Sequence, residues 1–331
     1  MSTAPLALPI LDEALESRLT SRMEEVEQAL HGHIHSEAGF VTEAAQHLLQ
    51  AGGKRFRPLL VLLAAETGDP GSDGVLTAAC VVELTHLASL YHDDVMDEAD
   101  LRRGAQSANA RWDNHVAILT GDFLFSKSSE LTASLGAEAV KIQAQTFTRL
   151  VEGQILETLG PMEGDDPLEH YLRVVAGKTG SLIATSARYG ARFAGATPDV
   201  EAALTEYGKK VGIAFQLSDD ILDIGSETEE SGKTPGTDLR EGVPTLPVLI
   251  ARRSTEPTDA RLLELLAADL SEDDLHAEAL ALLRGHSAMA EARAYVLDLA
   301  TEAKSLLKVL PEGTVRSSLE DFADVVATRS A

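Results

Sequence analysis

The chain has 331 residues, of which 44% are hydrophobic and only 4% are aromatic, so it can bury a sizeable core and is not a disordered tail. Abundant alanine and leucine, with few aromatic residues, favour helices over sheets. The net charge of -25, from 28 basic and 53 acidic residues, argues against general affinity for nucleic acids, although clustered cations or metal ions could still bind an anionic ligand within one cleft.

The N-terminal stretch, MSTAPLALPILDEALES, lacks a basic segment followed by a long apolar one, so it does not resemble a signal peptide. No apolar run approaches the roughly 18 residues that a membrane-spanning helix needs. We therefore expect a cytoplasmic protein whose first ~20 residues form a flexible or dimer-contacting arm.

Helical periodicity runs through the whole chain, and no segment alternates like a strand. A helix over residues 38–51 is predicted to end at Gly52-Gly53, and Pro58 suits the first turn of the next helix. The segment VLTAACVVELTHLASLYHDD, residues 75–94, is hydrophobic on nearly every face, which is typical of a helix at the centre of a bundle. It contains Cys80, the only cysteine, for which we expect an inert buried thiol.

Four further long helices are predicted, at 107–135, 138–159, 166–193 and 198–225, and shorter ones follow from residue 242. The Gly-rich polar segment 225–242 is the clearest loop. Composition does not change along the chain. We therefore predict a single all-α domain over residues 1–331, built as a large antiparallel helical bundle.

The most unusual feature is a pair of aspartate clusters that follow apolar helices. Asp93 and Asp97 are four residues apart and share one helix face, with Asp94 beside them. One such cluster alone would more often be a solvated acidic face. The second cluster repeats the spacing with Asp219, Asp220 and Asp223. Two such clusters favour Mg²⁺, which binds one or two carboxylates together with waters and substrate phosphates.

Several cations lie near glycines or helix starts, where a phosphate could bind. They are Lys54, Arg57, Arg102, Arg103, Lys178 and Lys233. Lys178 and Thr179 belong to a GKT sequence, but a P-loop would need glycine at position 172, which is leucine.

With these motifs, the chain resembles the trans-isoprenyl diphosphate (polyprenyl) synthases along almost its whole length, in particular the longer-chain all-trans-polyprenyl diphosphate synthases. The motifs that carry the resemblance occur in order and spacing: GGKRFRP, the His of ELTH, HDDVMDEADLRRG, GDFLFS, GKTGSL, FQLSDDILDI and GKTPGTDLREGVPTLP. The resemblance implies the isoprenoid synthase fold, an all-α bundle around a deep apolar cavity, and a homodimer. It also implies a Mg²⁺-dependent prenyltransferase that condenses isopentenyl diphosphate head-to-tail onto an allylic diphosphate, with at most peripheral membrane contact when a long product is released.

The same resemblance implies roles for individual residues. Ligands of Mg²⁺, three ions per active site, would be Asp93, Asp97 and Asp219, supported by Asp94, Asp220 and Asp223. The allylic diphosphate would be bound by Arg102, Lys178, Thr179, Gln216 and Lys233. Isopentenyl diphosphate would be bound by Lys54, Arg57, His86 and Arg103. The residues assigned to catalysis itself are Asp93, Asp94, Asp97, Lys178, Asp219 and Asp220.

His86 has an alternative role, because a histidine on a buried helix is more often a satisfied core residue. Its position two helical turns before Asp93, together with the family match, favours contact with ligand. Trp112 and Phe123 are predicted to be packing residues.

Three other classes of protein share part of this pattern. A di-iron bundle would need two ExxH motifs, and Glu83 with His86 forms only one. A terpene cyclase would not need the second aspartate cluster. A non-catalytic subunit of a heteromeric synthase would be expected to lack some of the aspartates or cations, and the full set is present.

Product length is predicted from the residues one turn before Asp93 on the same helix face. These are Ala88 and Ser89, and the next turn carries Leu84, Thr85 and Val81, none of them aromatic. The resemblance associates small residues here with longer products, so we expect an all-trans product longer than C20, in the range C30–C50. The alternative is a C15 or C20 product, if another helix near Phe123 or Phe147 closes the cavity.

Overall fold

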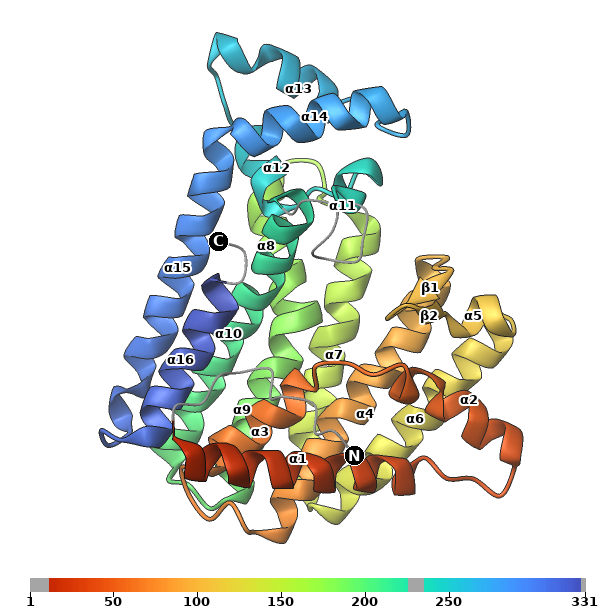
Figure 1. The fold of residues 1–331 in the computed structure, drawn as a ribbon, viewed down its shortest axis with the longest axis vertical. Coiled ribbons are helices and arrows are strands. Elements are labelled where there is room, and N and C mark those ends of the chain that lie inside the picture. Colours follow the sequence, from red (N-terminus) through yellow and green to blue (C-terminus); the bar gives the residue numbers. More distant parts are fainter. Residues whose placement is uncertain (1–11, 226–234, 329–331) are drawn as a thin grey trace. The chain divides into compact units, whose positions relative to one another are not determined.

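The structure is a computed structural model that describes residues 12–225 and 235–328 (Figure 1). Almost all of its regular structure is helical, so the all-α prediction is confirmed. Among the described residues, the strands are β1 (Leu101–Arg102) and β2 (Ala105–Gln106), which pair antiparallel with Leu101 opposite Gln106. Strands of two residues are too short to show an alternating pattern in the sequence.

The chain forms two compact units, each assembled from separate stretches of sequence. The first unit contains Met1–Phe147, Leu182–Thr205 and Val309–Leu319. The second contains Thr148–Ser181, Glu206–Lys308 and Glu320–Ala331. The single domain over residues 1–331 stays a prediction, and the two units are described separately below.

The first unit is built around α4 (Asp73–Met96), whose central residues are almost all buried. It packs against α6 (Asn114–Ser134), α3 (Phe56–Ala65) and α1 (Glu13–His33). This confirms the predicted central helix and the buried thiol of Cys80. Among the described helices, α4 alone has the length and composition to cross a membrane, but 72% of its apolar window is buried inside the protein. Packing in the core therefore accounts for its apolar character.

The other elements of the first unit are shorter, or are shared with the second unit. They are α2 (Gly39–Gln50), α5 (Ala108–Arg111), α9 (Ser181–Phe193), the start of α7 (Ala137–Leu159), the start of α10 (Pro198–Gly225) and the start of α16 (Thr314–Thr328). The sequence analysis did not identify α1, although Asp12 caps it through its side chain and Leu15 and Leu19 are buried.

The predicted helix over 107–135 is interrupted at Trp112 and Asp113. Trp112 has a non-helical backbone, and its ring packs edge-on against Phe40 and His47. The Asp113 side chain then accepts a hydrogen bond from Val116 N at 2.8 Å and caps α6. An aromatic anchor followed by a helix cap therefore divides the segment into α5 and α6.

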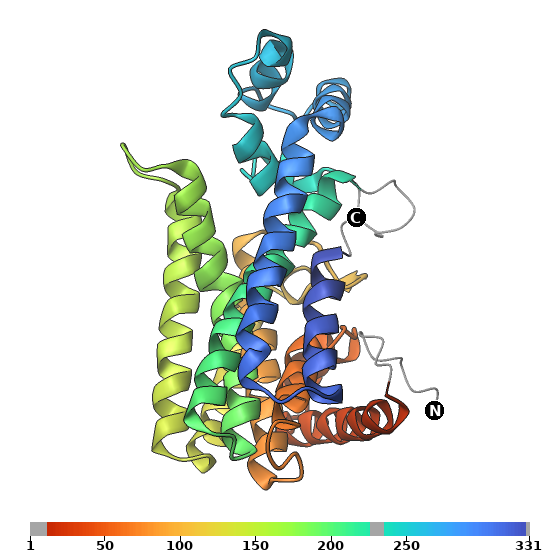
Figure 2. The same ribbon diagram turned by 90° about the vertical axis from the view of Figure 1, so that its left-hand side faces the viewer.

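The second unit contains the remaining helices and the rest of α7, α10 and α16. They are α8 (Pro167–Val175), η1 (Ala176–Gly180), α11 (Thr237–Arg240), α12 (Leu246–Ala251), η2 (Pro257–Asp259), α13 (Ala260–Leu266), α14 (Asp273–Gly285), α15 (Ser287–Leu306) and η3 (Leu307–Val309). The last part of α16 runs beside α15, where Lys304 pairs with Asp324 at 2.6 Å (Figures 1 and 2). It also packs on α10, because Ser218 Oγ donates to the carbonyl of Val326 at 2.8 Å.

The predicted helix over 166–193 contains one π-helical turn, η1, between α8 and α9. Two glycines allow its backbone to touch α7. A Cβ atom on Gly153 would lie 2.5 Å from Lys178 N, and one on Gly177 would lie 2.9 Å from Arg149 O. At this close approach the helix takes a π-helical turn in place of an α-helical one. The turn contains the GKT sequence with Lys178 and Thr179.

Candidate functional site

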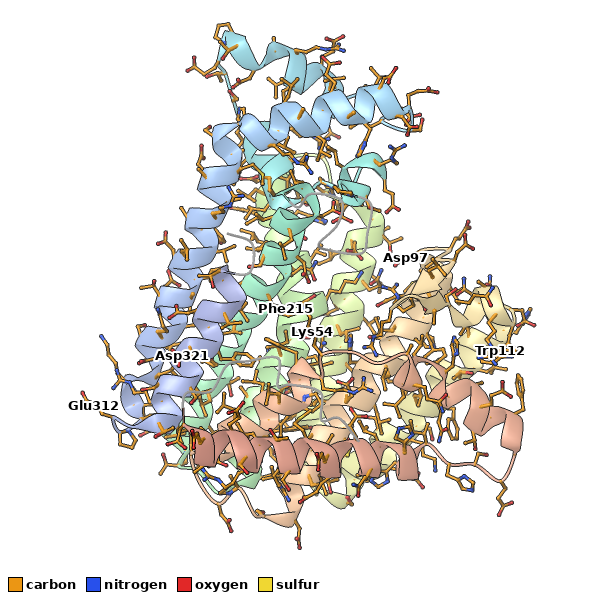
Figure 3. All side chains as sticks on the ribbon, in the orientation of Figure 1. Lys54, Asp97, Trp112, Phe215, Glu312 and Asp321 are labelled. Atoms are coloured by element: carbon orange, nitrogen blue, oxygen red, sulfur yellow. The ribbon has the colours of Figure 1, made fainter. Side chains whose placement is uncertain are left out.

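The first acidic cluster lies at the C-terminal end of α4, where Asp97 caps the helix and its side chain is 54% exposed (Figure 3). Beyond it, the chain reverses through the β1–β2 hairpin, whose loop residues Arg103 and Gly104 have φ of 54° and 77°. Positive φ at both positions is the geometry of a type I′ turn, which two-residue hairpins favour. Arg102, the last residue of β1, lies directly before this turn, and its side chain reaches the aspartates.

Asp94 is fully buried and has a cationic partner. Arg102 Nε donates to Asp94 Oδ1 at 2.5 Å, and Arg102 Nη2 lies 4.0 Å from Asp97 Oδ2. Burial raises the pKa of Asp94, and the charge of Arg102 acts in the opposite direction. Asp94 Oδ2 is buried and has no hydrogen-bond partner within residues 12–225 and 235–328. A buried carboxylate oxygen of this kind is a group that a cation would satisfy.

His86 lies in the middle of α4, and the charges of several arginines act on it. Burial is the main reason why the pKa of His86 lies well below its ordinary value. Nearby positive charges lower it further, in the order Arg57, Arg103, Arg55 and Arg102. His86 is therefore neutral at physiological pH and can donate one N–H. The local excess of positive charge is what binding of a diphosphate requires.

Of the other residues predicted to bind isopentenyl diphosphate, Lys54 lies on the loop between α2 and α3, Arg57 in the first turn of α3 and Arg103 on the hairpin. Lys54 is exposed in the loop (Figure 3). Burial lowers the pKa of Arg57 to about 10, so Arg57 keeps its proton at neutral pH, and its Nε atom has no partner in the part of the chain that the structure describes. Arg103 Nη1 donates to the carbonyls of Leu48, at 3.1 Å, and Gly52. The structure thus brings Arg57, His86 and Arg103 together.

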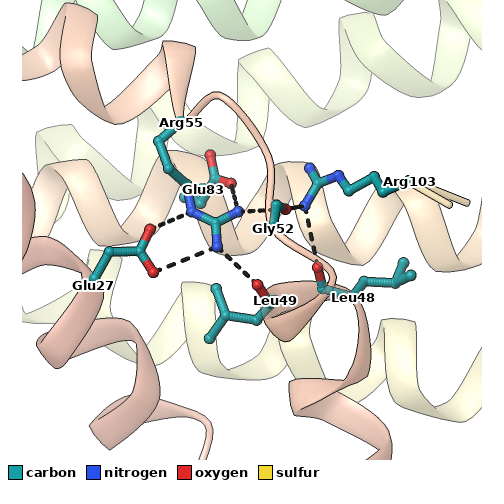
Figure 4. A network of polar contacts seen from close by, with 7 residues as sticks. All are labelled: Glu27, Leu48, Leu49, Gly52, Arg55, Glu83 and Arg103. Atoms are coloured by element: carbon teal, nitrogen blue, oxygen red, sulfur yellow. Dashed lines mark hydrogen bonds and ion pairs between the residues drawn. The ribbon is translucent and has the colours of Figure 1, made fainter. Parts of the chain in front are cut away.

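Arg55 and Glu83, which are both buried, form a network with the partly exposed Glu27 that was not predicted from the sequence. Arg55 bonds to Glu27 on α1 and to Glu83 on α4, the latter at 3.1 Å (Figure 4). Glu83 was considered above as a di-iron ligand, and the structure instead pairs it with an arginine. No three His, Cys, Asp or Glu side chains of the described ranges are grouped so that they could hold a metal ion by themselves. The di-iron alternative therefore has no structural support.

The second acidic cluster lies near the C-terminal end of α10, in the second unit. Asp220 is only 4% exposed, and it accepts hydrogen bonds from the hydroxyl of Tyr171 and from Gln216 Nε2, the latter at 3.2 Å. Burial raises the pKa of Asp220 well above its ordinary value, and neighbouring carboxylates raise it further. Those carboxylates belong to Asp238, Asp223 and Glu157.

The remaining predicted residues of the second unit also have identified positions. Thr179 Oγ1 donates to Gln216 Oε1 at 3.0 Å, which connects η1 to α10. Lys178 Nζ pairs with Glu157 Oε2 at 2.5 Å. The Asp223 carboxylate accepts from the backbone N–H groups of residues 237 and 238 and so caps α11. Asp219 is exposed, and Lys233 lies outside the described residues. Tyr171 and Glu157 were not predicted from the sequence, because no motif contains them.

A cavity of about 440 Å³ lies between α4, α6 and the start of α7 in the first unit. Its lining includes His92, Asp122, Phe125, Ser128, Ser129, Thr132, Val140, Gln143, Ala144 and Phe147. Phe125 and Phe147 pack edge-on, with ring centroids 4.6 Å apart. Of the predicted length-determining residues, Ala88 is fully buried and Ser89 Oγ donates to the carbonyl of His86 at 2.9 Å.

The acidic clusters suit Mg²⁺ by the chemistry of their oxygen donors and by the unsatisfied Asp94 Oδ2. Mg²⁺ takes only one or two carboxylates from a protein in such sites, and waters and phosphate oxygens supply the remaining ligands. A preformed group of three protein ligands is therefore not required.

Comparison with known proteins identifies the family. The model of the polyprenyl synthetase family matches residues 39–283. The chain is 45% identical over 329 residues to the nonaprenyl diphosphate synthase of Mycobacterium tuberculosis, covering 99% of this chain and 98% of that protein.

Solved structures give the same result. A geranylgeranyl pyrophosphate synthase from Corynebacterium glutamicum, complexed with calcium and isoprenyl diphosphate, matches with a TM-score of 0.88 and 46% identity over 97% of this chain and 99% of that chain. A decaprenyl diphosphate synthase from Rhodobacter capsulatus matches with a TM-score of 0.86 and 34% identity over 96% and 99%. These matches over the full length confirm the predicted resemblance, and the chain belongs to the polyprenyl synthetase family of prenyltransferases.

Proposed function

We propose that the protein is a Mg²⁺-dependent synthase that adds isopentenyl diphosphate repeatedly to an allylic diphosphate and makes an all-trans-polyprenyl diphosphate of C30–C50. The observation that carries the proposal is that Arg103 bonds to the loop that carries Lys54 and leads into Arg57, within the same unit as neutral His86 and the first acidic cluster. An anion site beside a carboxylate cluster fits a substrate whose diphosphate binds protein cations and a second diphosphate that binds through metal ions.

In this proposal, the cations of the first unit hold isopentenyl diphosphate. Lys54, Arg57 and Arg103 bind its diphosphate oxygens, and His86 donates an N–H to them. Because His86 is neutral, it orients the diphosphate without adding a fourth positive charge. These contacts fix the position of the reacting double bond relative to the allylic substrate.

The allylic diphosphate would be held by Arg102, Lys178, Thr179, Gln216 and Lys233, and Asp93, Asp97 and Asp219 would hold three Mg²⁺ ions. When bound, Mg²⁺ supplies positive charge that stabilises the departing diphosphate. The allylic C–O bond breaks, the double bond of isopentenyl diphosphate attacks the allylic carbon, and a new C–C bond forms. A proton is then lost to the departed diphosphate, which restores an alkene. Apolar surroundings keep water from the allylic cation.

The length of the product is the most specific part of the proposal, and the names of the relatives indicate products of different lengths. The Mycobacterium tuberculosis relative is named as a nonaprenyl synthase, whereas the Corynebacterium glutamicum relative is named as a geranylgeranyl synthase. Small residues at Ala88 and Ser89 favour the longer product, because nothing bulky closes the first turn below Asp93. The alternative is a short-chain C15 or C20 synthase, whose cavity would be closed by the aromatic pair Phe125 and Phe147.

We also propose that the enzyme is a cytoplasmic homodimer that uses α6 and α7. Ile118 and Leu119 on α6 are 43% and 65% exposed. Exposed apolar residues on α7 recur every four or seven positions and form one stripe. They are Val140, Phe147, Val151, Ile155 and Leu159. An apolar stripe along one helix suits a second copy of the chain, and sedimentation of a Leu119→Asp variant as a monomer would support this.

Chromatography of the dephosphorylated product tests the function and the length together. The purified wild-type protein alone, given isopentenyl diphosphate and farnesyl diphosphate, should make a product longer than C20. Ala88→Phe and Ser89→Tyr should shorten it, because an aromatic ring would close the path of the growing chain. A wild-type product that stops at C20 would favour the short-chain alternative, and no product at all would favour a non-catalytic subunit.

A further inference from the structure

Arg55 lies between two predicted ligands of isopentenyl diphosphate, Lys54 and Arg57, but its side chain is turned into the protein and is only 8% exposed. Its guanidinium uses all three nitrogens within the first unit. Nε bonds to Glu27 Oε1, Nη1 to Glu83 Oε1 and to Gly52 O, both at 3.1 Å, and Nη2 to Leu49 O at 2.9 Å and Glu27 Oε2 at 3.4 Å. A guanidinium with this many partners has little capacity left for a diphosphate.

The backbone of the same loop is held in an unfavourable conformation. Arg55 has φ of 47°, a left-handed conformation that side chains other than glycine seldom adopt, at the position that caps α3. Such a conformation persists only where the surroundings determine it. Here the side chain of Arg55 bonds to the carbonyls of Leu49, near the end of α2, and Gly52, at the start of the loop, and to the two glutamates. These bonds hold the loop in its conformation.

The network also reaches Arg103, a predicted ligand of isopentenyl diphosphate. The carbonyl of Gly52 accepts hydrogen bonds from both Arg55 Nη1 and Arg103 Nη1 (Figure 4). The guanidinium of Arg103 lies so close to the loop that a Cβ atom on Gly53 would be 2.8 Å from its Cζ. The position of Arg103 therefore depends on the conformation that Arg55 imposes on the loop.

The pair formed by Arg55 and Glu83 also affects the charges of the neighbouring arginines. Glu83 is 2% exposed, and its charge acts on Arg57 and Arg103 as well as on Arg55. A buried carboxylate takes a cationic partner where one is available. While Arg55 is paired with Glu83, the charges of Arg57 and Arg103 remain available to an anionic ligand.

We propose that Arg55 is a positioning residue for isopentenyl diphosphate: it fixes the loop that carries Lys54 and leads into Arg57 in the first turn of α3, and it keeps Glu83 from pairing with Arg57 or Arg103. The inference rests on the proposed function. Without Arg55, Glu83 would neutralise one of the two arginines, and the site would bind the diphosphate less tightly while the allylic site stays unchanged.

The test is steady-state kinetics of the full-length protein, in which isopentenyl diphosphate and farnesyl diphosphate are varied separately. Arg55→Gln should raise the KM for isopentenyl diphosphate about tenfold or more and leave the KM for farnesyl diphosphate within about twofold. Arg55→Gln/Glu83→Gln should recover the KM to within about threefold of wild type, because the competing carboxylate is gone. A merely structural role would give no such recovery.

A variant of Glu27 and a matched control test whether the effect comes from Glu83. Glu27→Gln removes the partner that is 37% exposed and leaves the Glu83 pair, so it should raise the KM by less than about threefold. Arg18→Gln, which breaks a surface pair with Glu66 in the same unit, is the matched control and should change neither KM. Should Arg55→Gln not fold, Arg55→Lys keeps the charge without the planar fork and should raise the KM about threefold.

The outcomes separate this inference from the proposed function. If the wild-type protein is active and folded Arg55 variants have an unchanged KM for isopentenyl diphosphate, or both KM values rise equally, the positioning role is wrong and the function stands. A double variant without recovery, or Glu27→Gln as defective as Arg55→Gln, overturns the role of Glu83. A wild-type protein that does not turn over isopentenyl diphosphate overturns the proposed function, and this inference with it.

Discussion

The two acidic clusters have the same residue spacing, but their carboxylates lie in opposite electrostatic surroundings. In the first unit, buried Asp94 is bonded to the cation of Arg102. In the second unit, buried Asp220 is bonded to neutral side chains, and the charges that act on it are mostly those of other carboxylates. The Asp94 carboxylate is therefore compensated by a protein cation, whereas the surroundings of Asp220 favour its uncharged form. One motif can thus be used in two ways within one chain.

The largest effect is expected from substitutions of the aspartates that are proposed to hold Mg²⁺. Asp93→Asn and Asp219→Asn should each lower kcat on the order of 10²-fold or more, because each would remove charge that holds Mg²⁺ at the departing diphosphate. Folding should change little, since each variant relieves repulsion between neighbouring carboxylates. Steady-state rates at saturating substrates measure the effect. Wild-type kcat in either variant would show that its cluster is only an acidic surface.

A large effect on stability is expected from Arg102→Ala in the first cluster. The substitution leaves the buried Asp94 carboxylate without its cation, so the free energy of unfolding should fall by about 3 kcal/mol. Urea denaturation without Mg²⁺ measures this. The control is Arg102→Ala/Asp94→Asn, in which most of the loss should be recovered because no charge remains unpaired. A loss below about 1 kcal/mol would mean that Asp94 is not compensated by Arg102.

The smallest effect is expected from Tyr171→Phe in the second cluster. The substitution removes one neutral hydrogen bond to Asp220, whose raised pKa already favours the uncharged carboxyl, and Gln216 remains bonded to it. The free energy of unfolding should fall by about 1 kcal/mol, less than for Arg102→Ala. The same denaturation experiment compares the two variants directly. The reverse order would contradict the difference between the clusters.

Much of the fold follows from local sequence signals. The apolar character of α4 and the ends of α7 and α10 are evident from hydrophobic periodicity and from the glycine and proline residues near their ends. The break at Trp112 and the π-helical turn at Lys178 could not be predicted in this way. Both depend on contacts with other elements, the first with Phe40 and the second with Gly153.

The candidate site, like the fold, could be predicted only in part from the sequence. The shared face of Asp93 and Asp97 needs only helical spacing, and the family motifs supply the cations. The pairing of Arg102 with Asp94 depends on the path of the chain between them, which includes a φ of 48° at Glu98, and no periodicity predicts it. Arg55 was visible within GGKRFRP, but its partners lie 28 residues away in either direction, so only the folded chain shows that it faces inward.

The most direct test of the whole account is diphosphate release by the purified wild-type protein from farnesyl diphosphate and isopentenyl diphosphate, with Mg²⁺ and with excess EDTA. The account predicts release that requires both substrates and falls by at least about 10²-fold in EDTA, because the carboxylates of both clusters then hold no cation at the departing diphosphate. Undiminished release in EDTA, or release that does not depend on isopentenyl diphosphate, would contradict it.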